Sequence, residues 1–433
     1  LNVDIACYGH PVVKTPNIDK LRERGMVFDR AYSQYPLCNP SRNSFMTGLQ
    51  PGTSGCLDNG MNIRVAVPDV VTLPQVFMNN GYRAVTTGKI YHQKDPASWS
   101  HISNVRTGGL LPTDREPMYY LKGWNDEGKT KGEGRMLADK TVPWFQWRAV
   151  TEGEEFLKDG RTARATINRI DEVVAEGGPF FMGVGFSRPH DPYFAPKRFF
   201  DLYSLEEMEW PESPADASAI PAHAFHQVFV DAFKTLDDQK KREAIRSYYA
   251  GISYMDEQLG VVMDYMEEKE LLDNTVVVFM GDHGYQVGEK NYFNKGLLFE
   301  RSCRSPLIIA APGMKTAGET CKRIVEFVDI YPTVTDLCGL EAPDHLDGIS
   351  LVPNLGNPNA DREEIAYTYC NADRSVRDPR FRYIVWKGGG HALYDHQKDS
   401  GEHYNLADNP EYAPVVKRMK KLIDEMPEPK KQG

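Results

Sequence analysis

A cysteine at position 38 stands in a segment whose residue types could carry out nucleophilic chemistry. The segment and the pair that closes it read Cys38-Asn39-Pro40-Ser41-Arg42 and Thr47-Gly48. Pro40 and Ser41 are typical of a helix start, and in such a helix Arg42 shares a face with Cys38 because residues four apart are neighbours. A buried cysteine before an ordinary helix start explains Pro40 and Ser41 but not Arg42 or the Thr47-Gly48 pair. Cys38 is therefore the first candidate for chemistry.

The dyad Asp282-His283 directly follows a predicted buried strand over Thr275 to Met280. Ligands of open α/β sheets gather at the carboxyl ends of strands, and a carboxylate there can bind a hard cation such as calcium. An aspartate that only caps the next turn is the alternative. His283 is a less usual ligand, because calcium prefers oxygen.

Three further segments carry side chains that could bind an anion or move a proton. They are Thr87 to His92 with Lys89 and His92, Ser187 to Tyr193 with His190, and Gly288 to Lys295 with Lys295 at its end. A lysine and a histidine in a loop are more often plain surface residues. Pro189 and Pro192 flank His190, which favours a fixed loop over a floppy one.

The elements that must position these residues follow an α/β pattern, in which strand-sized apolar runs alternate with helical periodicity. Phe180 to Phe186 reads as a second buried strand, and Ile245 to Glu268 carries a helical stripe that favours core packing. From Thr86 to Arg148 the weak periodicity predicts a long decorated loop region. Pro353 to Asp361 reads as a linker.

We place a domain boundary at this linker. A catalytic domain covers 1–355, and a small C-terminal subdomain covers 356–433, where a small antiparallel sheet is predicted before a terminal helix.

Composition excludes several classes of protein. The 433 residues have an ordinary apolar fraction, a formal net charge of -10 and no run long enough for a membrane helix. We therefore expect no membrane span and no nucleic-acid partner, and an anionic substrate would need a local basic pocket. The seven cysteines form no C-x-x-C pair. The six apart from Cys38 would suit three disulfides or buried thiols equally well.

The Cys38 segment resembles the motif C-x-P-S-R-x-x-x-x-T-G of the formylglycine-dependent (type I) sulfatases. The likeness extends over most of the chain, from Cys7-Tyr8-Gly9 to Leu393-Tyr394-Asp395. It is greatest for the iduronate-2-sulfatase-like branch, which includes bacterial polysaccharide sulfatases. It implies an alkaline-phosphatase-like sandwich, with a large mixed sheet between helices and a small C-terminal α+β subdomain.

The resemblance implies that a formylglycine-generating enzyme oxidises Cys38 to formylglycine, whose hydrate carries two geminal hydroxyls. One hydroxyl attacks sulfur and the other later expels sulfate, so that catalysis is covalent with a built-in release step. It also implies a bound Ca²⁺ with Cys38, Asp282 and His283 as ligands. Unmodified Cys38 should be nearly inactive.

The resemblance also assigns roles to the remaining candidates. Arg42 would hold the hydrate and a metal-bound oxygen, and His92 would hydrogen-bond the hydrate. Lys89 would bind a sulfate oxygen, and Lys295 would bridge sulfate and nucleophile. His190 would protonate the departing sugar oxygen as general acid.

One departure concerns the metal. The family carries an Asp-Asp pair at the end of a strand that precedes the stretch resembling Leu1 to Pro16, and this chain has neither the strand nor the pair. Asp4 falls after the expected position. The expectation is that the sequence is part of a longer protein; an incomplete metal site and an inactive protein are the alternative.

The resemblance favours a sulfated oligo- or polysaccharide as substrate, with a uronic acid as one candidate neighbour of the sulfate, and a periplasmic or secreted location. Candidate substrate contacts comprise the aromatic residues Trp99, Tyr119, Trp124, Trp144 and Trp147, which could equally pack loops on the sheet, and the basic residues Arg64, Arg106, Arg188 and Arg374. Two rivals remain: a phosphatase or phosphodiesterase of the same superfold, and an inactive relative that only binds sulfated glycans.

Overall fold

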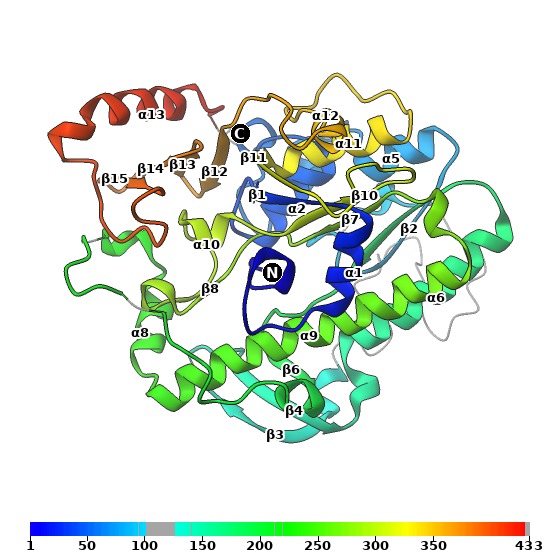
Figure 1. Ribbon diagram of the computed structural model, residues 1–433, viewed down its shortest axis with the longest axis horizontal. Helices are drawn as coiled ribbons and strands as arrows, with labels where there is room; N and C mark the ends of the chain where they lie inside the picture. Colours follow the sequence, from blue (N-terminus) through cyan, green and yellow to red (C-terminus); the bar gives the residue numbers. More distant parts are fainter. Residues whose placement is uncertain (94, 101–125, 140, 212, 219, 429–433) are drawn as a thin grey trace.

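A mixed four-stranded sheet lies at the centre of the protein (Figure 1). The computed structural model describes residues 1–93, 95–100, 126–139, 141–211, 213–218 and 220–428. The strand order is β11 (Thr320–Glu326), β1 (Met26–Tyr32), β10 (Leu307–Ala310) and β7 (Val277–Met280). β1 runs parallel to β11 and antiparallel to β10, which is antiparallel to β7. The α/β class and the mixed sheet are confirmed.

The two faces of this sheet pack against different helices, because successive strand residues point to opposite sides. Met26 and Phe28 of β1 belong to a buried cluster with α2 (Cys38–Thr47), α5 (Leu73–Asn79) and α11 (Ile330–Leu337). Val27 packs instead with α1 (Pro16–Arg24) and the long α9 (Asp238–Glu268). The helix predicted from the stripe over 245–268 is thus confirmed, and it begins earlier than predicted.

A second parallel pair brings two site segments together. β2 (Arg83–Gly88) pairs with β5 (Phe180–Gly185) in a register that sets Gly88 opposite Gly185. α6 (Lys158–Glu176) contacts β2 and β5. Since the two strands end side by side, the segments that carry Lys89 and His190 leave the sheet at the same edge.

Part of the region predicted as a decorated loop is a sheet. β3 (Lys131–Met136) and β4 (Gln146–Glu152) form a hairpin, and β4 pairs in parallel with β6 (Tyr193–Pro196), which follows the His190 loop. The loop prediction was wrong there, because β3 is exposed along its whole length and carries no apolar alternation, and the second partner of β4 lies more than forty residues downstream. Tyr119, Trp124 and Arg106 lie outside the described residues.

A four-stranded antiparallel meander forms the C-terminal part, as predicted. β12 (Ala366–Cys370), β13 (Asp373–Arg377), β14 (Phe381–Val385) and β15 (His391–Asp395) pair in sequence, and α13 (Ala413–Glu425) follows. The predicted linker is not wholly irregular, because α12 (Val352–Gly356) occupies its start, with Pro353 in the first turn, where proline is tolerated. The boundary at 355 stays a prediction.

Short elements complete the described chain. They are α3 (Pro51–Ser54), α4 (Ile63–Ala66), α7 (Lys197–Phe200), α8 (Gln227–Lys234), α10 (Glu300–Cys303), β8 (Gln286–Val287), β9 (Phe293–Asn294) and nine 3₁₀ turns, among them η3 (Asp126–Lys129). All seven cysteines are free. Within the described ranges, no helix has both the length and the apolar character needed to cross a bilayer.

Buried ion pairs join the C-terminal sheet to the rest of the protein. Arg382 of β14 contacts Glu300 of α10 at 2.7 Å and Glu402 at 2.8 Å. His396 lies 3.0 Å from the same Glu402 carboxylate. Because Arg382 engages both carboxylates, it links Glu300 to Glu402 and so joins the C-terminal sheet to α10.

Glu326, at the end of β11, gives the stability of this junction a pH dependence. Its Oε1 accepts hydrogen bonds from Gln34, Gln50 and the backbone N–H of Tyr367. Desolvation, reinforced by the nearby Asp329, raises the pKa of the Glu326 carboxyl from 4.5 to about 8. The folded state therefore retains a proton that the unfolded state releases, and this group lowers stability as pH rises from about 4.5 to about 8.

We predict that Glu326→Gln raises Tm relative to the wild type at pH 8, and that the gap narrows as the pH falls to 5, because the amide never ionises. Thermal unfolding across this pH range measures the gap. Glu319→Gln, at an exposed position, should track the wild type. Parallel curves for Glu326→Gln and the wild type would contradict the assignment.

Candidate active site

Cys38 is the first residue of α2, and its side chain is 3% exposed. The helix begins after the extended Leu37 and ends at Gly48, which has a positive φ of 69°. This left-handed position favours glycine, and a Cβ there would lie 2.4 Å from the Leu346 side chain. The Thr47-Gly48 pair of the motif therefore ends the helix that carries the cysteine.

Arg42 holds α2 against the end of β7. Its Nη2 lies 2.9 Å from Asp282 Oδ2, and its Nε donates to the same oxygen at 3.0 Å. Nη1 donates to the carbonyl oxygens of Lys89 and Ile90 at 2.5 and 2.8 Å, and the Ser41 hydroxyl donates to the Asp282 carbonyl. Ser41 and Arg42 thus join α2 to two segments that are distant in sequence, one with Lys89 and Ile90 and one with Asp282.

The Cys38 sulfur is surrounded by groups that favour a negative charge. Lys295 Nζ donates to Sγ at 3.2 Å, and His283 Nε2 lies 3.4 Å from Sγ. His190 also hydrogen-bonds to Cys38, and the Lys89 ammonium lies close enough to act on its charge. Burial opposes ionisation, but Lys295 and Lys89 together with the two imidazoles hold the pKa of the Cys38 thiol well below its usual value.

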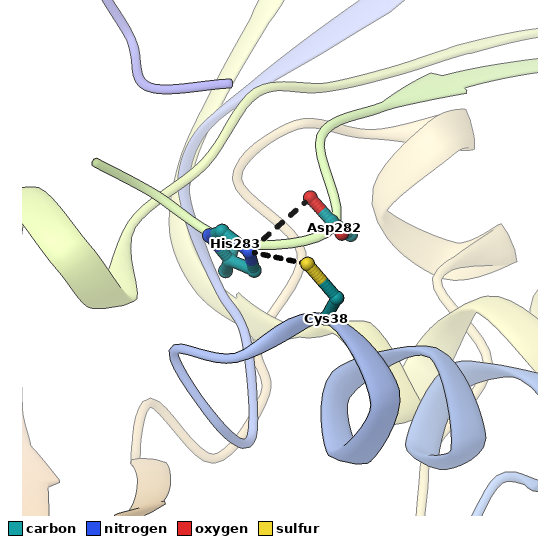
Figure 2. A group of neighbouring side chains, drawn as sticks. All are labelled: Cys38, Asp282 and His283. Carbon is teal, nitrogen blue, oxygen red and sulfur yellow. Dashed lines mark hydrogen bonds and ion pairs between the residues drawn. The ribbon is translucent and has the colours of Figure 1, made fainter. Parts of the chain in front are cut away.

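Three potential metal ligands, one of them the Cys38 sulfur, converge at this point (Figure 2). The ligand atoms of Cys38, Asp282 and His283 all lie within 4.8 Å of one another. His283 Nδ1 contacts the Gly284 carbonyl at 2.7 Å, so that Nδ1–H donates there and Nε2 faces the Cys38 sulfur. Burial would raise the pKa of Asp282, but His283 and Arg42 lower it, so that the carboxylate is charged.

This set fits one side of a calcium site. Asp282 Oδ2 is held by Arg42, which leaves Oδ1, 3.6 Å from His283 Nε2, to face the cluster. Calcium takes six to eight oxygen ligands, so further oxygens must join this carboxylate. The amino group of Leu1 donates to the His283 carbonyl at 3.2 Å. Leu1 therefore lies beside the cluster.

His190 has a carboxylate partner that sequence reasoning missed. His190 Nδ1 lies 3.1 Å from Asp191 Oδ1 and 2.6 Å from the Asp191 carbonyl. Burial would lower the pKa of His190, but Asp191 outweighs it and raises that pKa. The adjacent acidic residue was visible in the sequence, and an Asp beside a candidate general acid was the signal that could have been used.

The segment with His92 runs along the first turn of α2. Ile90 is held by Arg42, and the Gln93 N–H donates to Asn39 at 3.4 Å. His92 Nδ1 is buried without a hydrogen-bond partner among the described residues, and none of their hydrogen bonds joins His92 to Cys38. The structure thus unites Cys38, Arg42, Lys89, His190, Asp282, His283 and Lys295, whereas the contact of His92 with the nucleophile stays a prediction.

Comparison with known families decides the class of this site. Residues 2–340 match the sulfatase family, and residues 288–429 match the family described as N-sulphoglucosamine sulphohydrolase, C-terminal. The first match covers most of the chain. The chain belongs to the sulfatase family. It is a sulfuric ester hydrolase, and the resemblance to sulfatases is confirmed.

Named relatives are sulfatases of several kinds. A sulfatase of Formosa agariphila is 30% identical over 424 residues and covers 95% of this chain and 82% of the relative. Iduronate 2-sulfatase of Homo sapiens is 27% identical, with 90% of this chain and 83% of that protein covered. A solved structure in complex with D-glucosamine-2-N,6-O-disulfate has a TM-score of 0.75 at 22% identity, over 98% of this chain and 94% of the other. The alkaline-phosphatase-like fold is thereby confirmed.

The described aromatic candidates pack against other side chains, with Trp147 buried and Trp99 and Trp144 half-buried. Trp147 is buried and donates to Glu243 at 2.9 Å. Trp99 packs with Tyr91 and Phe181, and Trp144 contacts the Phe229 ring. The alternative interpretation, an aromatic side chain that packs within the fold, holds for the buried Trp147.

The described basic candidates are engaged in ion pairs. Arg64 binds Asp95 at 2.8 Å, and Arg374 binds Glu428 at 2.6 Å. Arg188 is buried against Glu127 at 2.6 Å, so its guanidinium is enclosed and engaged within the protein. A sequence shows the charge of an arginine but not the acid that folding sets beside it.

Lys295→Met is predicted to raise the pKa of the unconverted Cys38 thiol, because the ammonium that stabilises the thiolate is lost. The rate of Cys38 alkylation by iodoacetamide is measured against pH by peptide mass spectrometry. The midpoint of this curve gives the pKa of the thiol, whereas the accessibility of the sulfur changes only the plateau rate. Lys290→Met is the matched control, because Lys290 packs on Phe299, away from the sulfur. An unchanged midpoint for Lys295→Met would contradict the assignment.

Proposed function

We propose that this protein removes O-sulfate from a sulfated oligo- or polysaccharide by covalent catalysis at residue 38, with calcium bound beside it. The observation that supports the proposal most directly is the convergence of Lys89, Lys295, His190 and His283 on the buried Cys38. Fixed cations around a nucleophile are what a sulfate ester needs, because negative charge spreads over its oxygens as the ester bond breaks.

Each protein group has a separate task in this proposal. Lys89 and Lys295 bind the sulfate oxygens and hold sulfur in line with residue 38. Cys38 would be converted to formylglycine by a formylglycine-generating enzyme, and the hydrate would offer one hydroxyl for attack and a second for release of sulfate. Asp282 and His283 would hold Ca²⁺ beside residue 38, and the bound ion would supply positive charge that stabilises the sulfate oxygens.

His190 favours a sugar as the leaving group. A sugar alkoxide is a strong base and leaves only when protonated, whereas an aryl oxide can leave without help. The imidazole hydrogen-bonds to Cys38, and Asp191 favours its protonated form, so it can donate a proton beside the scissile bond. Several relatives bear carbohydrate names, among them an ulvan-active sulfatase and an N-acetylglucosamine-6-O-sulfatase. We also propose a periplasmic or secreted location, where such polymers are met.

The test is sulfate release by the full-length protein co-expressed with a formylglycine-generating enzyme and supplied with calcium. Sulfated glycosaminoglycan and algal oligosaccharides are the substrates, and ion chromatography measures free sulfate. We expect turnover by the converted protein. Cys38→Ser should abolish it while retaining the fold, because a serine ester lacks the second hydroxyl that expels sulfate. Glycan binding without turnover, or turnover by the serine variant, would contradict the proposal.

Replacement of His190 by Ala is predicted to lower kcat on a sugar sulfate by about 10²- to 10⁴-fold, the usual contribution of a general acid. The loss on 4-nitrophenyl sulfate should be much smaller, because nitrophenolate leaves without a proton. Steady-state kinetics on both substrates measure the difference. Equal losses on the two would remove His190 from the role of general acid.

A further inference from the structure

Arg188 hydrogen-bonds to the backbone of the loop that carries His190, and its side chain is 5% exposed. Arg188 Nε donates to the Phe194 carbonyl at 2.7 Å, and Nη1 donates to the His190 carbonyl at 3.3 Å. The guanidinium therefore joins the start of the loop to its end and also contacts the backbone of the histidine. Lysine could not reproduce this planar, forked set of bonds.

Two buried carboxylates from other elements fix Arg188 in turn. Glu127 of η3 accepts from Arg188 Nη2 at 2.6 Å. Asp159, in the first turn of α6, accepts the backbone N–H groups of Ser187 and Arg188 at 2.7 and 2.8 Å. Glu127 is 5% exposed and Asp159 is fully buried. This cluster ties the loop to α6 and to η3, elements that make no direct contact with the sulfur of Cys38 among the described residues.

We propose that Arg188, fixed by Glu127 and Asp159, is a positioning residue that sets where the His190 imidazole stands against Cys38. The inference rests on the proposed role of His190 and deepens it. The guanidinium itself touches neither Cys38 nor a metal ligand among the described residues. It acts through the backbone of His190, while Asp191 holds the ring. Small displacements of a catalytic group cost rate without weakening substrate binding.

The experiment compares Arg188→Lys, Glu127→Gln and His190→Ala in the converted, full-length protein. Glu243→Gln is the matched control, because it also removes a buried carboxylate charge bound by an arginine, Arg135, at 2.7 Å. We expect Arg188→Lys and Glu127→Gln to lower kcat on a sugar sulfate about tenfold. KM should stay within about twofold, and 4-nitrophenyl sulfate turnover should fall less. The control variant should keep the wild-type turnover of both the sugar sulfate and 4-nitrophenyl sulfate.

A double variant separates positioning from general loosening of the fold. If Arg188 acts through His190, Arg188→Lys should add no further loss to His190→Ala. Losses that multiply, or that are equal on sugar and aryl sulfates, would overturn the proposal while leaving the sulfatase assignment intact. A normal His190→Ala enzyme would instead overturn the role of His190, and the inference with it.

A measurement independent of turnover tests the position of the His190 ring directly. Imidazole ¹⁵N resonances of ¹⁵N-histidine protein, with His190 assigned by its loss in His190→Ala, report the surroundings of the ring. They should shift in Arg188→Lys or, if that variant fails to fold, in Glu127→Gln, and should be unchanged in Glu243→Gln. An unshifted His190 signal in a folded variant would overturn the proposal.

Discussion

The buried ion pair between Arg42 and Asp282 is the contact on which the rest of the site depends. It joins α2, which begins with Cys38, to the segment after β7 that carries Asp282 and His283. Both side chains are nearly enclosed, at 11% and 13% exposure. Loss of either partner would leave an uncompensated buried charge, a change that typically costs about 3–5 kcal/mol. The same guanidinium also fixes the backbone at Lys89 and Ile90, so that one residue aligns three parts of the site.

The site concentrates positive charge in a chain whose formal net charge is -10. Burial lowers the pKa of Lys89, whereas the Cys38 thiolate is the main group that keeps the pKa of Lys295 raised in spite of burial. In the unconverted chain the thiolate therefore stands where an anionic sulfate would bind. A neutral aldehyde hydrate would leave both ammonium groups without that partner, so that a sulfate oxygen becomes their natural ligand.

Much of this arrangement was predictable from sequence because its signals are local. The Cys38 motif combines a helix start, an arginine one turn later and a terminating glycine, and Asp282-His283 follow a strand whose end must face the site. The contacts that hold His190 and raise its pKa were not predicted. Asp191 was visible but unused, and Glu127 and Asp159 meet Arg188 only through folding. The sheet of β3, β4 and β6 was missed because β3 is exposed throughout and shows no apolar alternation, and because the pairing of β4 with β6 joins segments distant in sequence.

The most direct measurement is mass spectrometry of the tryptic peptide that contains Cys38, from full-length protein co-expressed with a formylglycine-generating enzyme. Covalent catalysis at this position requires an aldehyde, so the peptide should be lighter than the thiol form by about 18 Da, the difference between a CH₂SH group and a CHO group. A peptide that keeps the thiol mass under these conditions would contradict the proposed mechanism and would favour a protein that binds sulfated glycans without cleaving them.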